Sequence, residues 1–246
     1  MHRLFRISCL FLLALTPWVS FGQTPDYSEY AALLKKYVRP DGVKYSAWHQ
    51  STDDREKLKA ILAEWEIVAL PELSENAQKA FFINLYNAAM LDIVLDHYPL
   101  QSVATIEENF GIFRQDRIPL AGEKLSLDQI EKGILLQAFS DPRIHFAVNC
   151  ASESCPPLRA EPFTEAKLEA QLDEQTIAFA RSPRAARVNT GEQTIAYSEL
   201  FQWYDADFAG DNPAEYLNQY REDKLPLSFD VSWIRYDWML NESILE

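Results

Sequence analysis

The residues best suited to chemistry in this chain gather between residues 143 and 158. Cys150 and Cys155 lie in this segment, and His145 precedes the first cysteine by five residues. A cysteine thiolate can act as a nucleophile, a metal ligand or one half of a disulfide, and a neutral imidazole can act as a base or a metal ligand. The segment therefore indicates an enzyme site, a metal site or a covalent cross-link.

Apolar residues alternate with other residues over 144–149, which predicts a β-strand there. Side chains along a strand point alternately to its two faces, so His145 and Cys150 are expected on opposite faces. His145 is then a poor base for Cys150 despite its closeness in sequence. Cys155 follows in a loop that contains two prolines and escapes this restriction.

Four interpretations of the two cysteines stay open at the level of sequence. A Cys150–Cys155 disulfide would close a short loop and suits an exported chain. Cys150 could instead be a nucleophile at the end of the strand, activated by a base from elsewhere in the fold. A metal could bind His145, Cys150 and Cys155, although their spacing matches no standard zinc framework. Both cysteines could also simply pack in the interior.

Asn84 and Asn87 lie three residues apart in an apolar helical segment, so they share one face of that helix. A buried amide without partners costs a few kcal/mol, so both side chains need hydrogen bonds. One explanation is that they clamp the backbone of a neighbouring loop, and the other is that one of them orients a catalytic group or an oxyanion. The clamp is favoured, because most buried amides are satisfied by the surrounding structure.

Few other side chains qualify as a base. His49 lies in an early polar stretch, and the expected position of His97 at a helix C-terminus is explained by the helix dipole. Lys132 would serve as a base only if burial lowered its pKa. Carboxylates next to aromatic residues in 204–208 and 236–238 are interpreted as helix-end caps and turn residues.

Helical periodicity and capping residues predict a helix-rich chain with a few short strands. Ser126 and Gln129 have the spacing of a capping box, which predicts a helix that begins there. Further helices are predicted over 27–38, 52–70, 74–97, 165–180, 198–204 and 213–222, a hairpin over 188–197 and a late strand over 229–236. This pattern predicts an α+β fold, with helices around a small sheet in a single domain over residues 23–246.

The first residues have the features of a secretory signal. Arg3 and Arg6 precede an apolar stretch over 7–15 that is too short to span a bilayer, and small residues near position 22 offer a cleavage site. Residues 1–22 are therefore expected to be a signal peptide, and the protein is expected to be exported, periplasmic or extracellular. No later stretch is apolar over 18 residues, so no transmembrane segment is expected in the mature chain.

The charge of the chain argues against several classes of partner. It has 23 Lys and Arg against 37 Asp and Glu, a net charge of −14. A nucleic-acid-binding protein needs a basic surface, so this class is excluded, and binding to an anionic membrane surface is disfavoured. With seven glycines and neither a phosphate-binding loop nor a dinucleotide fingerprint, the sequence predicts no cofactor.

Five ordered blocks of sequence resemble the domain-of-unknown-function 547 family. They are FFINLYNA over 81–88, LSLDQIE over 125–131, RIHFAVNC over 143–150 with SCPPL over 154–158, WYDADF over 203–208 and YDWMLN over 236–241. The resemblance implies a fold similar to the papain and transglutaminase group. Fold alone does not determine function, so the activity has to be argued from the site.

The resemblance also implies roles for particular residues. The family's Asn-Cys block implies that Cys150 is the nucleophile, and its Ile-Glu-His block implies a base at the position of Lys132. Many members have His where this chain has Lys132, so the base is another group such as His145 or His97, or the member is catalytically weakened. Glu131 matches the family pattern as an orienting residue.

Two functions are therefore expected from different classes. The first is an exported thiol-dependent hydrolase or acyl transferase for peptide or amide bonds, in which Cys150 attacks and Asn84 or Asn87 orients the base or the oxyanion. The alternative is a non-catalytic binding or scaffold domain that is held by a Cys150–Cys155 disulfide. The sequence specifies neither substrate nor partner.

Overall fold

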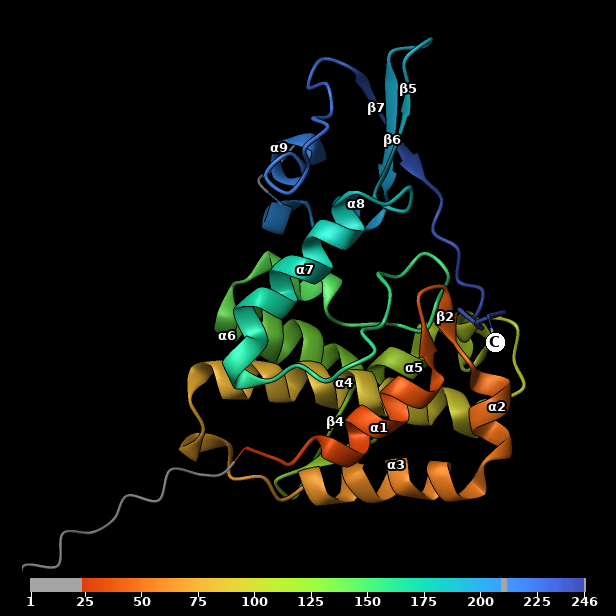
Figure 1. Cartoon of the computed structure of the whole chain (residues 1–246), viewed down its shortest axis with the longest axis vertical. Helices are drawn as coiled ribbons and strands as arrows, with labels where there is room; N and C mark the ends of the chain where they lie inside the picture. The colour runs from red at the N-terminus through yellow and green to blue at the C-terminus, as the bar shows by residue number, and fades with distance from the viewer. Residues whose placement is uncertain (1–23, 209–211, 246) are drawn as a thin grey trace, which may run out of the picture.

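The computed structural model describes residues 24–208 and 212–245 (Figure 1), so the predicted signal peptide over 1–22 lies outside the described residues. The α-helices are α1 (Ser28–Tyr37), α2 (Tyr45–Gln50), α3 (Thr52–Trp65), α4 (Glu75–His97), α5 (Gly111–Arg114), α6 (Leu136–Phe139), α7 (Leu168–Ala180), α8 (Leu200–Trp203) and α9 (Pro213–Leu217). The strands are β1 (Val38–Arg39), β2 (Gly42–Val43), β3 (Ile118–Leu120), β4 (Glu123–Leu125), β5 (Ala186–Asn189), β6 (Thr194–Ser198) and β7 (Asp230–Ile234).

Short non-α turns complete the described chain. A π-helix, η4, spans Gln129–Leu135. The 3₁₀ helices are η1 (Leu70–Glu72), η2 (Val103–Thr105), η3 (Glu108–Phe110), η5 (Pro142–Phe146), η6 (Glu165–Lys167) and η7 (Asp205–Phe208). The helix-rich α+β character predicted from sequence is confirmed.

The long helix α4 is the centre of the helical body. Ser74 caps it, because the Ser74 hydroxyl accepts a hydrogen bond from the backbone N–H of Ala77 at 3.1 Å. Side chains on all sides of α4 are buried, as expected for a helix that is apolar around its whole circumference. It contacts α2, α3 and η4, and Figure 1 shows it crossing the lower body above α3.

The apolar side chains form two separate clusters. The first packs α1 to α4 together with η4 and the start of α7, and the second joins the end of α7, α8 and α9 to β5 and β6. In Figure 1, α7 lies between the helical body and that sheet. The segment over 144–148 contributes to both clusters, and it therefore runs along the boundary between them.

The described strands form three small sheets rather than one central sheet. β1 pairs with β2 and β3 with β4, each antiparallel. In the third sheet β5 and β6 form the antiparallel hairpin predicted over 188–197, and β7 adds to β6 in parallel. The predicted hairpin and late strand are thus confirmed.

The predicted strand over 144–149 is wrong. The chain forms the 3₁₀ helix η5, which Asp141 caps by accepting a hydrogen bond from the backbone N–H of Arg143 at 3.1 Å. The apolar alternation has another cause: Ile144 packs in the first cluster, whereas Phe146 packs in the second. In a segment that runs between two apolar clusters, apolar residues can occur at every second position, as they do in a half-buried strand, although no strand forms.

The capping box is confirmed, although the helix that it opens is unusual. The backbone N–H of Ser126 donates to Gln129 Oε1 at 2.6 Å, and that of Gln129 donates to Ser126 Oγ at 3.1 Å. The next residues form the π-helix η4, and α6 follows directly. π-Helical turns are rare and often occur at functional sites.

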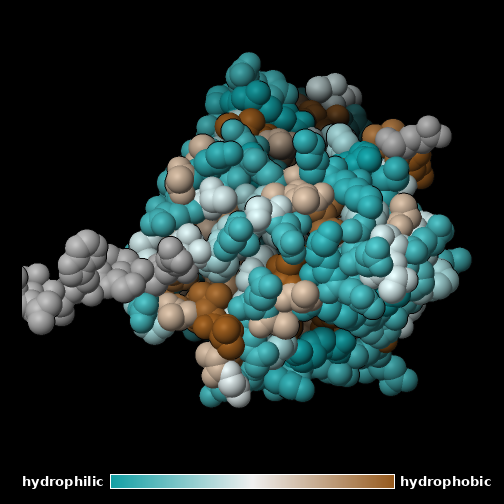
Figure 2. All heavy atoms as spheres, turned by 60° about the horizontal axis from the view of Figure 1, so that its bottom comes forward, coloured by the Kyte–Doolittle hydropathy of each residue, from teal (hydrophilic) through white to brown (hydrophobic). Residues whose placement is uncertain are grey.

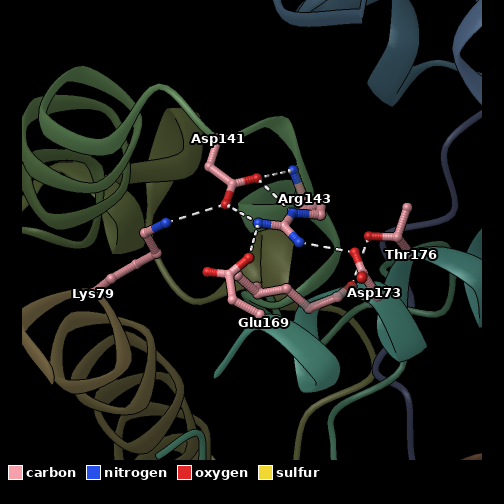
Figure 3. A network of polar contacts seen from close by, with 7 residues as sticks. Lys79, Asp141, Arg143, Glu169, Asp173 and Thr176 are labelled. Carbon is pink, nitrogen blue, oxygen red and sulfur yellow. Dashed lines mark hydrogen bonds and ion pairs between the residues drawn. The ribbon is translucent and has the colours of Figure 1, made fainter. Parts of the chain in front are cut away.

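An ion-pair network fixes η5 against its neighbours (Figure 3). The guanidinium of Arg143 donates to Asp141 at 2.9 and 2.8 Å, to Glu169 at 2.7 Å and to Asp173 at 2.8 Å. Lys79 of α4 donates to the same Asp141 at 3.2 Å. Burial alone would raise the pKa of Asp141, but its contacts with Arg143 and Lys79 lower it. The network joins η5 to both α4 and α7.

The C-terminal segment returns from β7 to the start of the chain. It passes the loop that follows Cys150, where Glu153 N donates to Met239 O at 2.8 Å. It then pairs with β2, where Val43 N donates to Asn241 O at 2.9 Å. This approach needs a glycine at position 42, since a Cβ there would lie 2.1 Å from Asn241 O.

Among residues 24–208 and 212–245, no helix combines the length and the apolar character that a bilayer crossing requires. On the face in Figure 2, hydrophilic side chains predominate and hydrophobic ones occur as separate small patches. That face agrees with the charged composition of the chain.

Candidate functional site

The loop that carries Cys150 is held by two buried amides. Asn87 of α4 donates to Ala147 O at 2.9 Å and accepts from Asn149 N at 2.8 Å. Asn149 in turn donates to Pro156 O at 2.8 Å. The amides therefore fix the backbone before and after Cys150, as the clamp predicted from sequence requires.

Asn84 makes a second clamp of the same kind elsewhere. It donates to Phe163 O at 2.7 Å and accepts from Phe163 N at 2.9 Å. Two reciprocal hydrogen bonds satisfy this buried amide in the same way as those of Asn87. Asn84 therefore secures the segment before α7, and both of these hydrogen bonds go to Phe163 rather than to the cysteine loop.

The residue after Cys150 has a left-handed backbone. Ala151 has φ +60°, a conformation that costs a non-glycine residue on the order of 1 kcal/mol or more. Two contacts maintain it: Ala151 N donates to Asn149 Oδ1 at 2.9 Å, and Ala151 O accepts from Asn241 N at 3.0 Å. Strained residues of this kind persist only where the surrounding structure enforces them, and they concentrate at functional sites.

The sulfur of Cys150 is surrounded by polar groups. It lies 3.0 Å from Ser152 Oγ and 3.3 Å from Tyr236 Oη, and the Ser152 hydroxyl also donates to Tyr236 Oη at 3.3 Å. Burial would raise the pKa of Cys150, but hydrogen bonds from Cys155, Ser152 and Tyr236 outweigh it and lower the pKa to about 7. A substantial fraction of Cys150 is therefore thiolate at neutral pH.

Cys155 differs from Cys150 although the two are neighbours. The backbone N–H of Cys150 donates to Cys155 Sγ at 3.0 Å, and both cysteines are free thiols. Burial and the nearby charge of Cys150 raise the pKa of Cys155 well above its ordinary value. The pair thus contains one acidic thiol and one that stays protonated.

His145 is buried and paired with a carboxylate that lies far away in sequence. Its Nε2 lies 2.8 Å from Asp207 Oδ2, and its ring packs against Tyr204 with the centroids 4.2 Å apart. Burial lowers the pKa of His145 although Asp207 opposes this effect, so the imidazole is neutral at pH 7. A neutral imidazole oriented by a carboxylate is suited to accept a proton.

Cys150 and His145 line the same cleft, which has a volume of about 430 Å³. This result corrects the expectation that they lie on opposite faces, because that expectation required a strand. Much of the cleft wall is aromatic, formed by Tyr86, Phe110, Trp203, Tyr204, Tyr236 and Trp238. A concave, largely apolar site with a few convergent polar groups is the usual form of a small-molecule or peptide site.

Lys132 and Glu131 reach this cleft from the π-helix η4. Lys132 Nζ pairs with Asp128 Oδ1 at 2.8 Å, and about half of its side chain is exposed (52%). It is therefore not a desolvated base at the sulfur, and the hydrogen bonds of Cys150 Sγ include no His, Lys or carboxylate. Glu131 Oε1 accepts from Tyr204 Oη at 2.9 Å.

His97 lies apart from the cysteines. Its Nδ1 is 2.7 Å from Ile93 O within the last turns of α4, and it borders a different hollow. Among the described residues, no group of three or more His, Cys, Asp or Glu side chains is placed to hold a metal ion.

Three residues of the site were not identified from sequence: Ser152, Asp207 and Tyr236. Asp207 and Tyr236 belong to the aromatic blocks that were interpreted as caps and turns. The neighbouring carboxylates and rings were the available signal, but nothing in the sequence indicated their partners. Tyr236 is 86 residues from Cys150, and Asp207 is 62 residues from His145.

Part of the chain matches a known protein family. Residues 70–180 match the family described as "Protein of unknown function, DUF547", which confirms the resemblance for the blocks between 81 and 158; the blocks over 203–208 and 236–241 lie outside the matched residues. The matched stretch includes α4, η4, η5 and both cysteines. No curated protein and no solved structure matches the chain.

Proposed function

Because residues 70–180 of this chain form a DUF547 family domain that carries Cys150, we propose that the protein is a thiol-dependent hydrolase or acyl transferase for peptide or amide bonds. One observation carries the proposal: a cysteine with a lowered pKa faces the same cleft as a His145–Asp207 pair. Nucleophile, base and a carboxylate that orients the base are the groups that covalent acyl transfer needs.

In the first step, the Cys150 thiolate attacks the carbonyl carbon of the substrate and a carbon–sulfur bond forms. The carbonyl oxygen becomes an oxyanion, for which the Ser152 and Tyr236 hydroxyls next to the sulfur are the available donors. The carbon–nitrogen bond then breaks, and the amine leaves after it takes up a proton from water. A thioester on Cys150 remains.

In the second step, the thioester is transferred to water or to an amine. His145 accepts a proton from the attacking molecule, since it is neutral at pH 7 and Asp207 holds its Nε2. The new carbon–oxygen or carbon–nitrogen bond replaces the carbon–sulfur bond, and Cys150 is released. Hydrolysis and transfer differ only in which molecule enters the cleft.

The hydrogen bonds that lower the pKa of Cys150 come from Cys155, Ser152 and Tyr236. Cys150 is followed by a turn rather than by a helix, so it does not lie at the N-terminus of a helix. The proposed relation to the papain and transglutaminase group consequently rests on the resemblance of the sequence blocks.

An acyl donor that reports on the first step tests the proposal. A 4-nitrophenyl ester is expected to release one equivalent of nitrophenolate rapidly and to leave an acyl group on the Cys150 peptide in mass spectrometry. Cys155→Ala is expected to keep this adduct, Cys150→Ala to lose it, and His145→Ala to retain the adduct for longer. Acylation that is absent, or equal in Cys150→Ala, would sink the proposal.

The alternative is a binding or scaffold domain with a Cys150–Cys155 disulfide. Its support is the closeness of the cysteines, since Cys150 N lies 3.0 Å from Cys155 Sγ. Alkylation of the purified protein without reductant separates the two functions: a bridged pair adds no label. A complete bridge that resists mild reductant would favour the scaffold.

We also propose that residues 1–22 direct export to the periplasm or the extracellular space and that the remaining chain folds as a single domain. The composition of the N-terminal segment supports export. N-terminal sequencing of the secreted protein tests it, with Gln23 expected as the first residue.

A further inference from the structure

One carboxylate in the cleft has no positive partner. Glu131 of η4 is half-buried, and within residues 24–208 and 212–245 no Lys or Arg lies within ion-pair distance of it. Its neighbour Lys132 pairs with Asp128 instead. Removing a carboxylate from water without a partner of opposite charge is unfavourable, so a half-buried carboxylate that faces a cleft is available to pair with a cationic group of a ligand.

The charge of Glu131 acts on the side chains around the cleft. Burial and then Glu131 raise the pKa of Tyr86 and of Tyr204, so both phenols stay protonated. Tyr204 donates to Glu131 at 2.9 Å, which orients the carboxylate without neutralising it. His145 does not compensate it either, because burial keeps the imidazole neutral at pH 7.

The aromatic rings of the cleft are a second feature that favours the binding of a positive group. Trp203 and Trp238 line the cleft and stack with their centroids 5.8 Å apart and an interplanar angle of 16°. Trp203 is 47% exposed, although large apolar side chains are usually covered. The faces of exposed indole rings bind cations such as ammonium and guanidinium groups.

The other charged side chains of the cleft make no ion pair with Glu131. Asp128 and Lys132 neutralise each other. Arg114 lies on α5, where its guanidinium donates to the backbone oxygen of Asn109. Arg114 therefore belongs to the wall formed by η3 and α5, whereas Glu131 belongs to the wall formed by η4.

We propose that the cleft binds substrates that carry an alkylammonium or guanidinium group, and that Glu131 pairs with this group. The inference rests on the proposed function, because the cation lies in the cleft that holds Cys150. The substrate class is then a peptide or amide with a positive charge close to the bond that Cys150 attacks. Glu131 is the residue that determines this specificity.

Binding to a protein that cannot react tests the inference apart from catalysis. In Cys150→Ala, the Kd of N-acetyl-lysine amide is compared with that of N-acetyl-norleucine amide, which has a similar shape but no charge. We expect the lysine amide to bind roughly tenfold more tightly at low salt, the scale of one charge-assisted contact. Calorimetry and tryptophan fluorescence provide two readouts.

Adding Glu131→Gln is expected to remove this preference while the norleucine amide binds as before. Gln can still accept the hydrogen bond from Tyr204, and an unchanged Tm shows that the fold persists. Glu64→Gln on the exposed face of α3 changes the net charge equally and is expected to keep the preference. Equal binding of both amides, no binding of either, or a preference that survives Glu131→Gln would overturn the inference.

The two proposals fail in different ways. A preference for the lysine amide without any acylation of Cys150 in the unmodified protein would refute the proposed reaction and leave a cation-binding cleft. Acylation of Cys150 without such a preference would keep the reaction and refute the role of Glu131.

Discussion

At the scale of single residues, Cys150 obtains its acidity from hydrogen bonds with Cys155, Ser152 and Tyr236 rather than from a base in contact with it. Ser152 and Tyr236 lie 3.0 and 3.3 Å from the sulfur. Because its pKa of about 7 lies below that of a thiol in an unfolded chain, the ionised form stabilises the fold at high pH. This contribution is lost as the pH falls through about 7.

Replacing Tyr236 by Phe should make Cys150 less acidic. The thiolate loses one hydrogen bond, so we expect the midpoint of the pH profile for alkylation by iodoacetamide to rise from about 7 by roughly one pH unit. The rate is measured by mass spectrometry of the Cys150 peptide between about pH 5 and pH 10, a range that includes the pKa values of both acidic and ordinary thiols.

Tyr98→Phe is the matched control, since Tyr98 is a partly buried ring that packs against His49. It is expected to leave the alkylation profile unchanged. An unaltered midpoint in Tyr236→Phe would show that the hydroxyl of Tyr236 does not stabilise the thiolate.

At the scale of elements, α4 positions the site through amides rather than through a catalytic side chain. Asn87 and Asn84 project from the same helix and make equivalent pairs of hydrogen bonds, one to the cysteine loop and one to Phe163. The π-helix η4 then brings Glu131 to the same cleft. These rigid elements hold a loop that has no regular structure of its own.

The two amides permit a paired experiment. Asn87→Ala and Asn84→Ala should each lower the free energy of unfolding by roughly 2–4 kcal/mol, because each leaves a buried N–H and a buried C=O unpaired. Only Asn87→Ala should also change the alkylation rate of Cys150, since only Asn87 holds the cysteine loop. Chemical denaturation and alkylation provide the measurements.

Equal effects of both variants on alkylation would contradict this division. The reactivity of Cys150 would then follow global stability rather than the local clamp. An Asn87→Ala protein that is destabilised but alkylates at the original rate would contradict it as well.

At the scale of the whole molecule, the C-terminal segment completes the site. It runs from the three-stranded sheet down to β2 (Figure 1). It carries Tyr236, passes the cysteine loop, and meets Gly42 at Asn241. The site therefore combines the matched family domain over 70–180 with residues beyond it, namely Tyr236 and Asp207.

Gly42→Ala should disturb this assembly from a distance. A Cβ at residue 42 would lie 2.1 Å from Asn241 O, so the C-terminal segment must shift. We expect a loss of about 1–3 kcal/mol in the free energy of unfolding and a slower alkylation of Cys150. Thermal unfolding and alkylation measure both effects.

Gly133→Ala is the control, because a Cβ at Gly133 meets no atom within 4 Å. It should leave both stability and alkylation nearly unchanged. A Gly42→Ala protein that behaves like this control would show that the close approach of the C-terminal segment to Gly42 does not hold the segment in place.

Local patterns predicted the elements well where one apolar cluster determined them. The long helix, the capping box at Ser126 and the hairpin over 188–197 all follow from nearby residues, and all are present. The strand over 144–149 failed because its apolar residues face two different clusters. Because of that error, His145 and Cys150 were predicted to lie on opposite faces, whereas both line the same cleft.

The sequence by itself determined the helix-rich α+β character, the family of residues 70–180 and the pair of cysteines as the chemical centre. Only the tertiary structure decided which groups meet there. Spacing along the chain predicts local backbone geometry, but Asp207 and Tyr236 reach His145 and Cys150 across 62 and 86 residues. Contacts over such separations depend on how the elements pack, and no local pattern records that.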